Sequence, residues 1–193
     1  MSQTTSSPAS HRFTETTPEF SAVETELAAH QIPTSHRNID RLAMAHDASH
    51  YLMVPQGIVR PSSAGEVAQV MAAAHRAGLP MSFRSGGTSL SGQAVSDGVM
   101  VDTRRSFRGI EILDEGARVR VQPGATVGAV NGALKRYGRK LGPDPASSSA
   151  CTVGGVVANN SSGMSCGTDF NTYRTLESMA VSYTHLTLPT NRE

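Results

Sequence analysis

Three stretches of the chain carry apolar residues at the three- and four-residue spacing of a helix, at residues 18–30, 63–78 and 126–138. Ser63 and Glu66 form a capping-box pattern at the start of the second stretch, and a threonine is placed to cap the third. The apolar positions are Phe20, Val23 and Leu27, then Val67, Val70, Met71 and Ala74, then Val127, Val130, Leu134 and Tyr137. These patterns predict three amphipathic helices.

Short apolar runs predict strands at residues 57–60, 81–84 and 98–102. Because a predicted helix separates the first two strands by short connections, we expect them to be parallel and joined by a right-handed crossover. Residues 110–113 and 118–121 carry alternating Ile and Val around an Asp-Glu-Gly turn, which predicts a hairpin with one buried face. The expected fold class is therefore α+β, with a βαβ unit followed by a hairpin–helix unit in two subdomains.

Composition and charge narrow the choice of function. The 193 residues carry a formal net charge of +1, which gives no broad electrostatic footprint for nucleic acid. No apolar run approaches the roughly 20 residues of a membrane helix. Only two cysteines occur, Cys151 and Cys166, which is typical of a reducing compartment and favours a cytoplasmic location. His46 and His50 would share a metal ion only on a helix, and the Glu of a His-Glu-x-x-His motif is absent, so no metal site is expected.

A first Gly/Ser-rich stretch, at residues 84–93, reads Arg-Ser-Gly-Gly-Thr-Ser-Leu-Ser-Gly-Gln and lies between two predicted strands. Paired glycines let consecutive N–H groups form a concave nest for anions, so a diphosphate is a natural ligand. Gly87 and Gly92 have the spacing of a P-loop, but Gln93-Ala94 occupies the place of the required Lys-Ser/Thr pair. A Gly-x-Gly-x-x-Gly motif is absent, which disfavours a Rossmann site. A long flexible turn is the alternative interpretation.

A second Gly/Ser-rich stretch covers residues 142–163 and is too long for a plain connector. Its three valines argue against disorder, and its many small residues indicate a backbone packed tightly against a flat ligand. Residues 163–167 match the Gly-x-Ser-x-Gly pattern of a hydrolase nucleophile elbow. That elbow needs a strand before it and a helix after it, and neither is predicted here, which disfavours a serine hydrolase.

The two stretches together resemble a known family. Residues 84–93 resemble the diphosphate loop of FAD-linked oxidases that carry the PCMH-type (vanillyl-alcohol-oxidase-type) FAD domain, and residues 152–163 are similar to the second signature of that family. The resemblance covers residues 45–181 and is greatest to cytochrome-type D-lactate dehydrogenases and glycolate oxidase flavoprotein subunits. It implies the N-terminal part of an FAD-binding domain at 57–181. The residues before it predict a disordered, Ser/Thr/Pro-rich segment at 1–19 and a helical and irregular lead-in at 20–56.

Residues 182–193 form a tail that does not resemble the family. We expect a truncated or chimeric reading frame after Val181, with the catalytic and substrate-binding residues of the family outside this chain. No catalytic residue is therefore predicted in it.

The resemblance implies a set of cofactor-binding residues and a noncovalent FAD. The residues implied to hold the FAD diphosphate are Ser85, Gly86, Gly87, Thr88, Ser89 and Gly92. Those implied to line the flavin and its ribityl chain are Pro143, Asp144, Ser149, Thr152, Gly154, Gly155, Asn160, Ser161 and Gly163. Some relatives bond flavin covalently through a histidine right after the paired glycines, where this chain has Thr88.

The activity that the resemblance implies is oxidation of a 2-hydroxy acid of the D-lactate or glycolate type to the 2-oxo acid, with hydride transfer to flavin. The expected partners are that small acid and an electron acceptor, which could be a quinone, a cytochrome, an iron–sulfur centre or oxygen. A cytoplasmic location or a peripheral association with the membrane is compatible with this. The alternatives are an inactive fragment, a flavin-binding module, a reductase of cell-wall precursor synthesis, or the FAD domain of a redox-neutral transferase related to alkyl-glycerone-phosphate synthases.

Overall fold

The computed structural model describes residues 16–182 and 187–191, and the side chains up to residue 182. Its helices are α1 (Pro18–Ala29), α2 (Asn38–Ala43), α3 (Ala64–Arg76), α4 (Val127–Leu134), α5 (Val153–Ala158) and α6 (Thr172–Thr175). Its strands are β1 (Thr34–Ser35), β2 (Gly57–Val59), β3 (Met81–Arg84), β4 (Val99–Asp102), β5 (Ile110–Leu113), β6 (Arg118–Val121), β7 (Ser178–Ser182) and β8 (Thr187–Asn191). The predicted α+β fold is confirmed.

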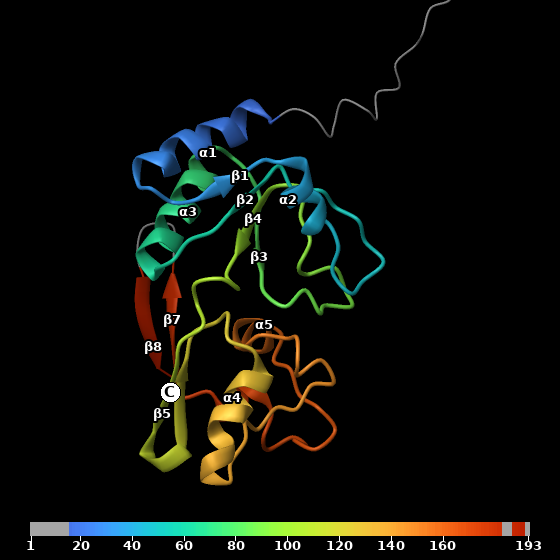
Figure 1. Cartoon of the computed structure of the whole chain (residues 1–193), viewed down its shortest axis with the longest axis vertical. Coiled ribbons are helices and arrows are strands. Elements are labelled where there is room, and N and C mark those ends of the chain that lie inside the picture. The colour runs from blue at the N-terminus through green and yellow to red at the C-terminus, as the bar shows by residue number, and fades with distance from the viewer. Residues whose placement is uncertain (1–15, 183–186, 192–193) are drawn as a thin grey trace, which may run out of the picture.

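The order of strands in the first sheet is β1-β2-β4-β3, so β4 separates the two strands that flank α3 (Figure 1). Both β2 and β3 run parallel to β4, so they are parallel to each other, as predicted, and β1 pairs with β2 in the antiparallel sense. All four residues of β4 are buried. A central parallel strand is covered on both faces, which agrees with its uninterrupted Val-Met-Val run.

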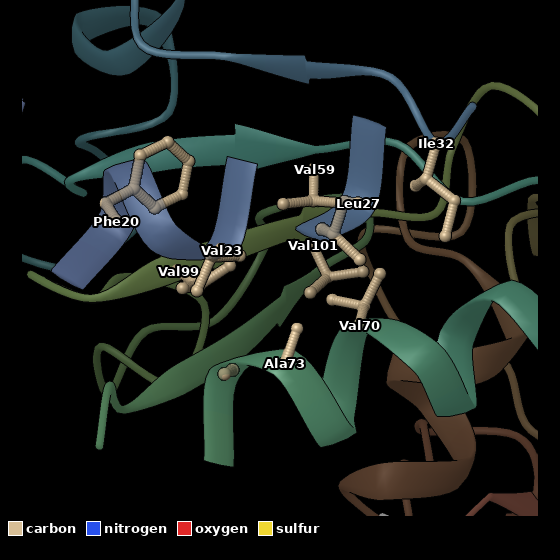
Figure 2. Close-up of a cluster of buried hydrophobic side chains, with 10 residues drawn as sticks. Phe20, Val23, Leu27, Ile32, Val59, Val70, Ala73, Val99 and Val101 are labelled. Atoms are coloured by element: carbon tan, nitrogen blue, oxygen red, sulfur yellow. The ribbon is translucent and has the colours of Figure 1, made fainter. Parts of the chain in front are cut away.

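The main core lies between this sheet and helices α1 and α3 (Figure 2). Phe20 and Leu27 of α1 pack with Val70 of α3 against Val99 and other valines of the sheet, and all four are fully buried. The remaining members of this cluster are Val23, Ile32, Val59, Ala73, Ala74 and Val101. Ile58 and Met100 form a smaller cluster with Met44 of the lead-in. The sheet is thus held by two helices on one face and by the lead-in segment on the other.

Local capping explains where the two helices begin. The Thr17 side chain accepts a hydrogen bond from the N–H of Phe20 at 3.3 Å, and Ser63 accepts one from the N–H of Glu66 at 3.2 Å. The capping box at α3 forms only in part. The Glu66 carboxylate accepts from the N–H and hydroxyl of Ser62, both at 2.7 Å, because that serine offers two donors in place of the single N–H of the cap residue.

The second unit is the hairpin β5–β6 packed on α4. Ile110 pairs with Val121 and Ile112 with Val119, and these side chains lie against Val130 and Leu134 of α4. Thr126 caps α4 by accepting from the N–H of Ala129 at 3.1 Å, and Gly138, at a φ of 65°, ends the turn that follows it. The predicted hairpin and third helix are confirmed.

Three predictions on local structure differ from the structure. The stretch predicted as irregular, 33–56, contains β1 and α2, and the second Gly/Ser-rich stretch contains α5. Disorder was expected for 1–19, but Pro18 and Glu19 already belong to α1, and 1–15 lie outside the described residues. Residues 187–191 of the tail form β8, which pairs with β7. No helix in the described ranges is long and apolar enough to cross a membrane.

Candidate functional site

The first Gly/Ser-rich loop starts where β3 ends, at the carboxyl edge of the parallel sheet. Ligands of open α/β sheets bind at this edge, since the loops that follow the strands converge there. The Ser85 hydroxyl lies 3.2 Å from the hydroxyl of Thr103, which follows β4, and this contact fixes the start of the loop. Gly87 and Gly92 have φ values of 68° and 74°, in the region that favours glycine.

The two Gly/Ser-rich loops meet at Gly86. A methyl group on this residue would lie 2.4 Å from the carbonyl oxygen of Ala150 and 2.9 Å from the Cα of Cys151. Only glycine permits this approach of one backbone to the other. At the rim, the Gln93 side chain donates to the Asn159 side chain at 3.3 Å. The structure therefore brings together the two loops that the sequence singled out separately.

Several donors near this contact have no acceptor in the part of the chain that the structure describes. They include the N–H groups of Gly86, Gly87 and Thr88 and, at the start of α5, the N–H of Gly155. The hydroxyl of Thr152 is buried and also lacks a partner. Buried polar groups are nearly always hydrogen-bonded, so an unpartnered hydroxyl beside free N–H groups indicates a place for an acceptor-rich ligand.

At the start of α5, some backbone N–H groups are hydrogen-bonded within the protein and that of Gly155 is left available in the described part of the chain. The N–H of Val153 donates to Ala125 at 2.9 Å and that of Gly154 donates to Pro123 at 2.9 Å, so both are used within the protein. Gly154 packs on Pro123, where a methyl group would lie 2.6 Å from the proline Cβ. By contrast, Gly155 is exposed, and a methyl group on it would lie 3.9 Å from the Cβ of Ser85. Gly155 thus lies on the side of α5 that faces the first loop.

Other predicted site residues hold the loops in shape. The Ser89 hydroxyl accepts from the N–H groups of Ser91 and Gln93, both at 3.2 Å, and donates to the Gln93 side chain at 3.1 Å. Gly92 lies against the ring of Tyr51, where a methyl group would be 2.5 Å from a ring carbon. The hydrogen bonds of the Ser89 hydroxyl and the packing of Gly92 against Tyr51 therefore hold the first loop in its conformation.

In the second loop, the Asp144 carboxylate accepts from the N–H of Ser165 at 3.1 Å, and hydrogen bonding from Ser165 lowers the pKa of that carboxyl. Gly163 packs on Asp144 so closely that a methyl group would be 2.1 Å from a carboxylate oxygen. Asn160, at a φ of 44°, accepts from the N–H of Tyr173 at 3.0 Å. The packing of Gly163 on Asp144 closes the loop, and the two hydrogen bonds tie it to the segment that follows, at Ser165 and Tyr173. Pro143 is buried beneath it, Ser149 is exposed, and the carbonyl of Ser161 accepts from the hydroxyl of Thr172 at 2.5 Å.

The sequence motifs did not reveal that Asp47, in the lead-in segment, is bonded to the end of the first loop. Asp47 accepts from the N–H of Ser49 at 2.8 Å and from the N–H of Ala94 at 3.3 Å. Burial by itself raises the pKa of the Asp47 carboxyl, but these hydrogen bonds outweigh burial and the net pKa is lowered. The lead-in segment is therefore tied to the end of the first loop. An Asx-turn pattern, Asp-x-Ser, was the one signal in the sequence.

Two alternative sites lack the geometry that their chemistry needs. The segment around His46 and His50 forms a bridge between His46 and Leu52 and is not helical, so the two rings are not aligned by a helix. The Gly-x-Ser-x-Gly segment follows a turn and is itself a turn, with the N–H of Ser165 bonded to Asp144. The strand and helix of a nucleophile elbow are missing on either side of it, within the described ranges.

Comparison with known proteins identifies the family. Residues 55–184 match the family model described as FAD binding domain, and the chain belongs to this family. The predicted resemblance to FAD-linked oxidases is confirmed. The free donors and close-packed glycines at the two loops fit a cofactor that carries a diphosphate.

The curated relatives of similar sequence are named for 2-hydroxy acids. The chain is 38% identical over 128 residues to D-2-hydroxyglutarate dehydrogenase of Escherichia coli K12, which covers 64% of this chain and 13% of that protein. It is 36% identical over 120 residues to glycolate oxidase subunit GlcD of the same strain, which covers 61% of this chain and 24% of that protein. The chain thus spans less than a quarter of the length of these relatives.

Solved structures share the fold. An alkyldihydroxyacetonephosphate synthase superposes with a TM-score of 0.77 at 23% identity, over 92% of this chain and 35% of that one. A glucooligosaccharide oxidase from Acremonium strictum, whose structure is described as revealing a novel flavinylation, superposes with a TM-score of 0.76 at 22% identity, over 88% of this chain and 36% of that one. At these identities the likeness shows the fold alone.

Replacing Gly86 with Ala tests the contact between the loops. We expect Gly86→Ala to lower the free energy of unfolding by about 1–3 kcal/mol, because the added methyl group meets backbone atoms that cannot move independently. The matched control is Gly132→Ala in α4, where nothing lies within 4 Å of the new methyl group. This control should raise stability by about 0.5–1 kcal/mol, since alanine is the better helix former. Thermal and urea unfolding followed by circular dichroism measure both, and equal effects would contradict the contact.

The Asp102–Arg104 pair predicts an acid-dependent stability. Asp102 is 1% exposed and is bound by the Arg104 side chain at 2.9 Å. Burial raises the pKa of Asp102, but hydrogen bonds from Arg104 outweigh burial and the net pKa lies below the ordinary 3.8. The ionised pair thus stabilises the fold above pH 3.8, and this contribution is lost as pH falls through the lowered pKa. The urea midpoint of unfolding, measured as a function of pH, should fall in acid for the parent and should fall less for Asp102→Asn.

The partner variant Arg104→Met should remove the same acid dependence, because it removes the hydrogen bonds that keep Asp102 ionised. The double variant, with Asp102→Asn and Arg104→Met, should then have a free energy of unfolding little lower than that of either single variant. This is expected when two residues act as one pair. Additive losses in the double variant would show that the two side chains act separately.

Proposed function

We propose that this protein binds FAD across its two Gly/Ser-rich loops. The observation that carries the proposal is the meeting of the loops at Gly86, beside N–H groups and a buried hydroxyl that have no acceptor in the described part of the chain. In this arrangement the diphosphate accepts from the N–H groups of Gly86, Gly87 and Thr88. The Thr152 hydroxyl and the N–H of Gly155 then serve the ribityl chain or the flavin.

The other residues of the proposed site shape it. Ser85, Ser89 and Gly92 set the conformation of the diphosphate loop through the contacts described above. In the second loop, the residues that form the wall beside the flavin are Pro143, Asp144, Ser149, Gly154, Asn160, Ser161 and Gly163. The hydrogen bonds that Asp144 and Asn160 accept from the segment after this loop support a wall that is formed before the cofactor binds.

The proposed FAD is held without a covalent bond. Thr88 follows the paired glycines and cannot attach flavin through an imidazole nitrogen. The nearest thiol in the second loop, Cys151, is buried, and its burial raises the pKa of the thiol. Because the thiolate is the nucleophile, this environment disfavours a cysteinyl link.

We further propose that the flavin serves the oxidation of a small 2-hydroxy acid, because curated relatives of similar sequence are named for D-2-hydroxyglutarate, glycolate and D-lactate. When bound, FAD supplies the redox chemistry by accepting hydride. The role of this chain is to bind and orient the cofactor and to supply the N–H groups around its phosphates. The proposal assigns no catalytic residue to it and no particular electron acceptor. The transferase alternative has only fold likeness at 23% identity in its favour.

We propose a cytoplasmic setting for this activity. Both cysteines are free and buried, as expected in a reducing compartment.

The visible absorption spectrum of the purified chain, recorded after incubation with FAD and desalting, tests the binding site. We expect a flavin spectrum that survives desalting in the parent and in the Gly132→Ala control but is lost in Gly86→Ala, because separating the loops disperses the donors. Acid precipitation should then release all of the flavin into the supernatant. A colourless protein with a well-formed circular dichroism spectrum would show that these loops serve another ligand. Flavin that stays with the precipitate would contradict noncovalent binding.

The substrate class is tested with the complete product of the gene, loaded with FAD and supplied with a dye acceptor. We expect dye reduction with D-2-hydroxyglutarate, glycolate or D-lactate and none with the matching 2-oxo acids. A flavin-loaded product that reduces the dye with none of the three acids would contradict the substrate class while leaving the FAD site in place.

A further inference from the structure

Arg84, the last residue of β3, is a buried cation without an ion-pair partner in the described residues. It is 7% exposed. Its Nη1 donates to the carbonyl of Ala94 at 2.9 Å and more weakly to that of Met44 at 3.4 Å, and its Nη2 donates to the carbonyl of His46. Its Nε has no partner. Buried arginines are normally paired with a carboxylate, whereas here only carbonyl dipoles oppose the charge.

The nearby carboxylates are committed elsewhere. Asp47 accepts from the N–H groups of Ser49 and Ala94, and Asp102 is bound by Arg104. Burial, and then the positive charge of Arg104, lower the pKa of the Arg84 guanidinium, while Asp47 and Asp102 oppose this only in part. The charge of Arg84 is therefore not fully compensated by the protein.

The first Gly/Ser-rich loop passes directly over this cation. A methyl group on Gly87 would lie 2.7 Å from Nη2 and 2.8 Å from Nε of Arg84. Gly87 is therefore glycine for two reasons, its φ of 68° and the guanidinium against its Cα. The N–H groups of Gly86, Gly87 and Thr88, which have no acceptor in the described residues, belong to this same turn.

We infer that Arg84 is a positioning residue for an anionic diphosphate, acting from beneath the loop rather than by contact. It ties the lead-in segment and Ala94 to the end of β3, and its uncompensated charge attracts the anion through the thin backbone of Gly87. This inference rests on the proposed FAD site, since it assigns the diphosphate to the same loop. A purely structural arginine would tie these segments together but would not attract the anion.

Two variants distinguish the tying of the segments from the attraction of the anion. Arg84→Lys keeps the charge but loses the guanidinium hydrogen bonds to backbone carbonyl groups, and Arg84→Met keeps neither. The matched control is Arg76→Met on α3, which removes an exposed arginine paired with Glu26. Each is made in the full chain, and titration calorimetry measures binding of FAD and of inorganic pyrophosphate over a series of salt concentrations.

We expect Arg84→Met to weaken pyrophosphate and FAD binding about tenfold and to flatten the salt dependence of both, because a charge facing the anion is gone. Arg84→Lys should keep the salt dependence of the parent and most of the pyrophosphate affinity. Arg76→Met should bind as the parent does.

The inference would be overturned if Arg84→Met lost the same affinity at every salt concentration, so that its affinity depended on salt as in the parent. Binding by Arg84→Met as tight as that of the parent would also overturn it. If Arg84→Met does not fold, Arg84→Lys decides: a pyrophosphate affinity within about threefold of the parent supports a role of the charge, and a larger loss overturns it. A parent chain that binds pyrophosphate but not FAD would overturn the proposed function alone, and one that binds neither would overturn both.

Discussion

The approach of Gly86 to the backbone of Ala150 and Cys151 is the constraint on which the rest of the site depends. It joins the loop after β3 to the loop before α5, and so joins the parallel sheet to the hairpin–helix unit. The contact continues into the second unit, because the carbonyl of Cys151 accepts from the N–H of Val127 at the start of α4. A side chain larger than hydrogen at residue 86 would disturb both loops and the helix behind them.

The polar groups around this contact divide into two kinds. Ser89 uses its hydrogen bonds inside the first loop, and Asp144 and Asn160 accept from the segment that follows the second loop, so that both loops are held in one shape. Thr152 and Gly155 keep donors that nothing in the described residues accepts. This division is what a preformed site requires, since the groups that fix the geometry cannot also bind the ligand. It is also consistent with the proposed site for a flat cofactor in a chain with few aromatic residues.

Elements with strong local patterns could be predicted from the sequence, whereas those determined by distant contacts could not. The strand at 81–84 and the cap at Thr126 depend on nearby residues and were predicted correctly. Helix α5 was missed because its two adjacent glycines are poor helix formers, and its first turn is held by carbonyls of Pro123 and Ala125. The acceptors of Arg84 at Met44 and His46 lie about 40 residues away along the chain, so no local pattern could reveal its burial.

The central position of β4 in the sheet affects how the protein folds during its synthesis. Strands β2 and β3 leave the ribosome before β4, yet in the folded sheet they do not pair with each other, because β4 lies between them. Until residue 102 has emerged, α1 and α3 have no sheet on which to lay their apolar faces. The nascent chain therefore carries exposed Phe, Leu and Val side chains for the whole of this interval, which makes it a natural client for chaperones that bind apolar segments.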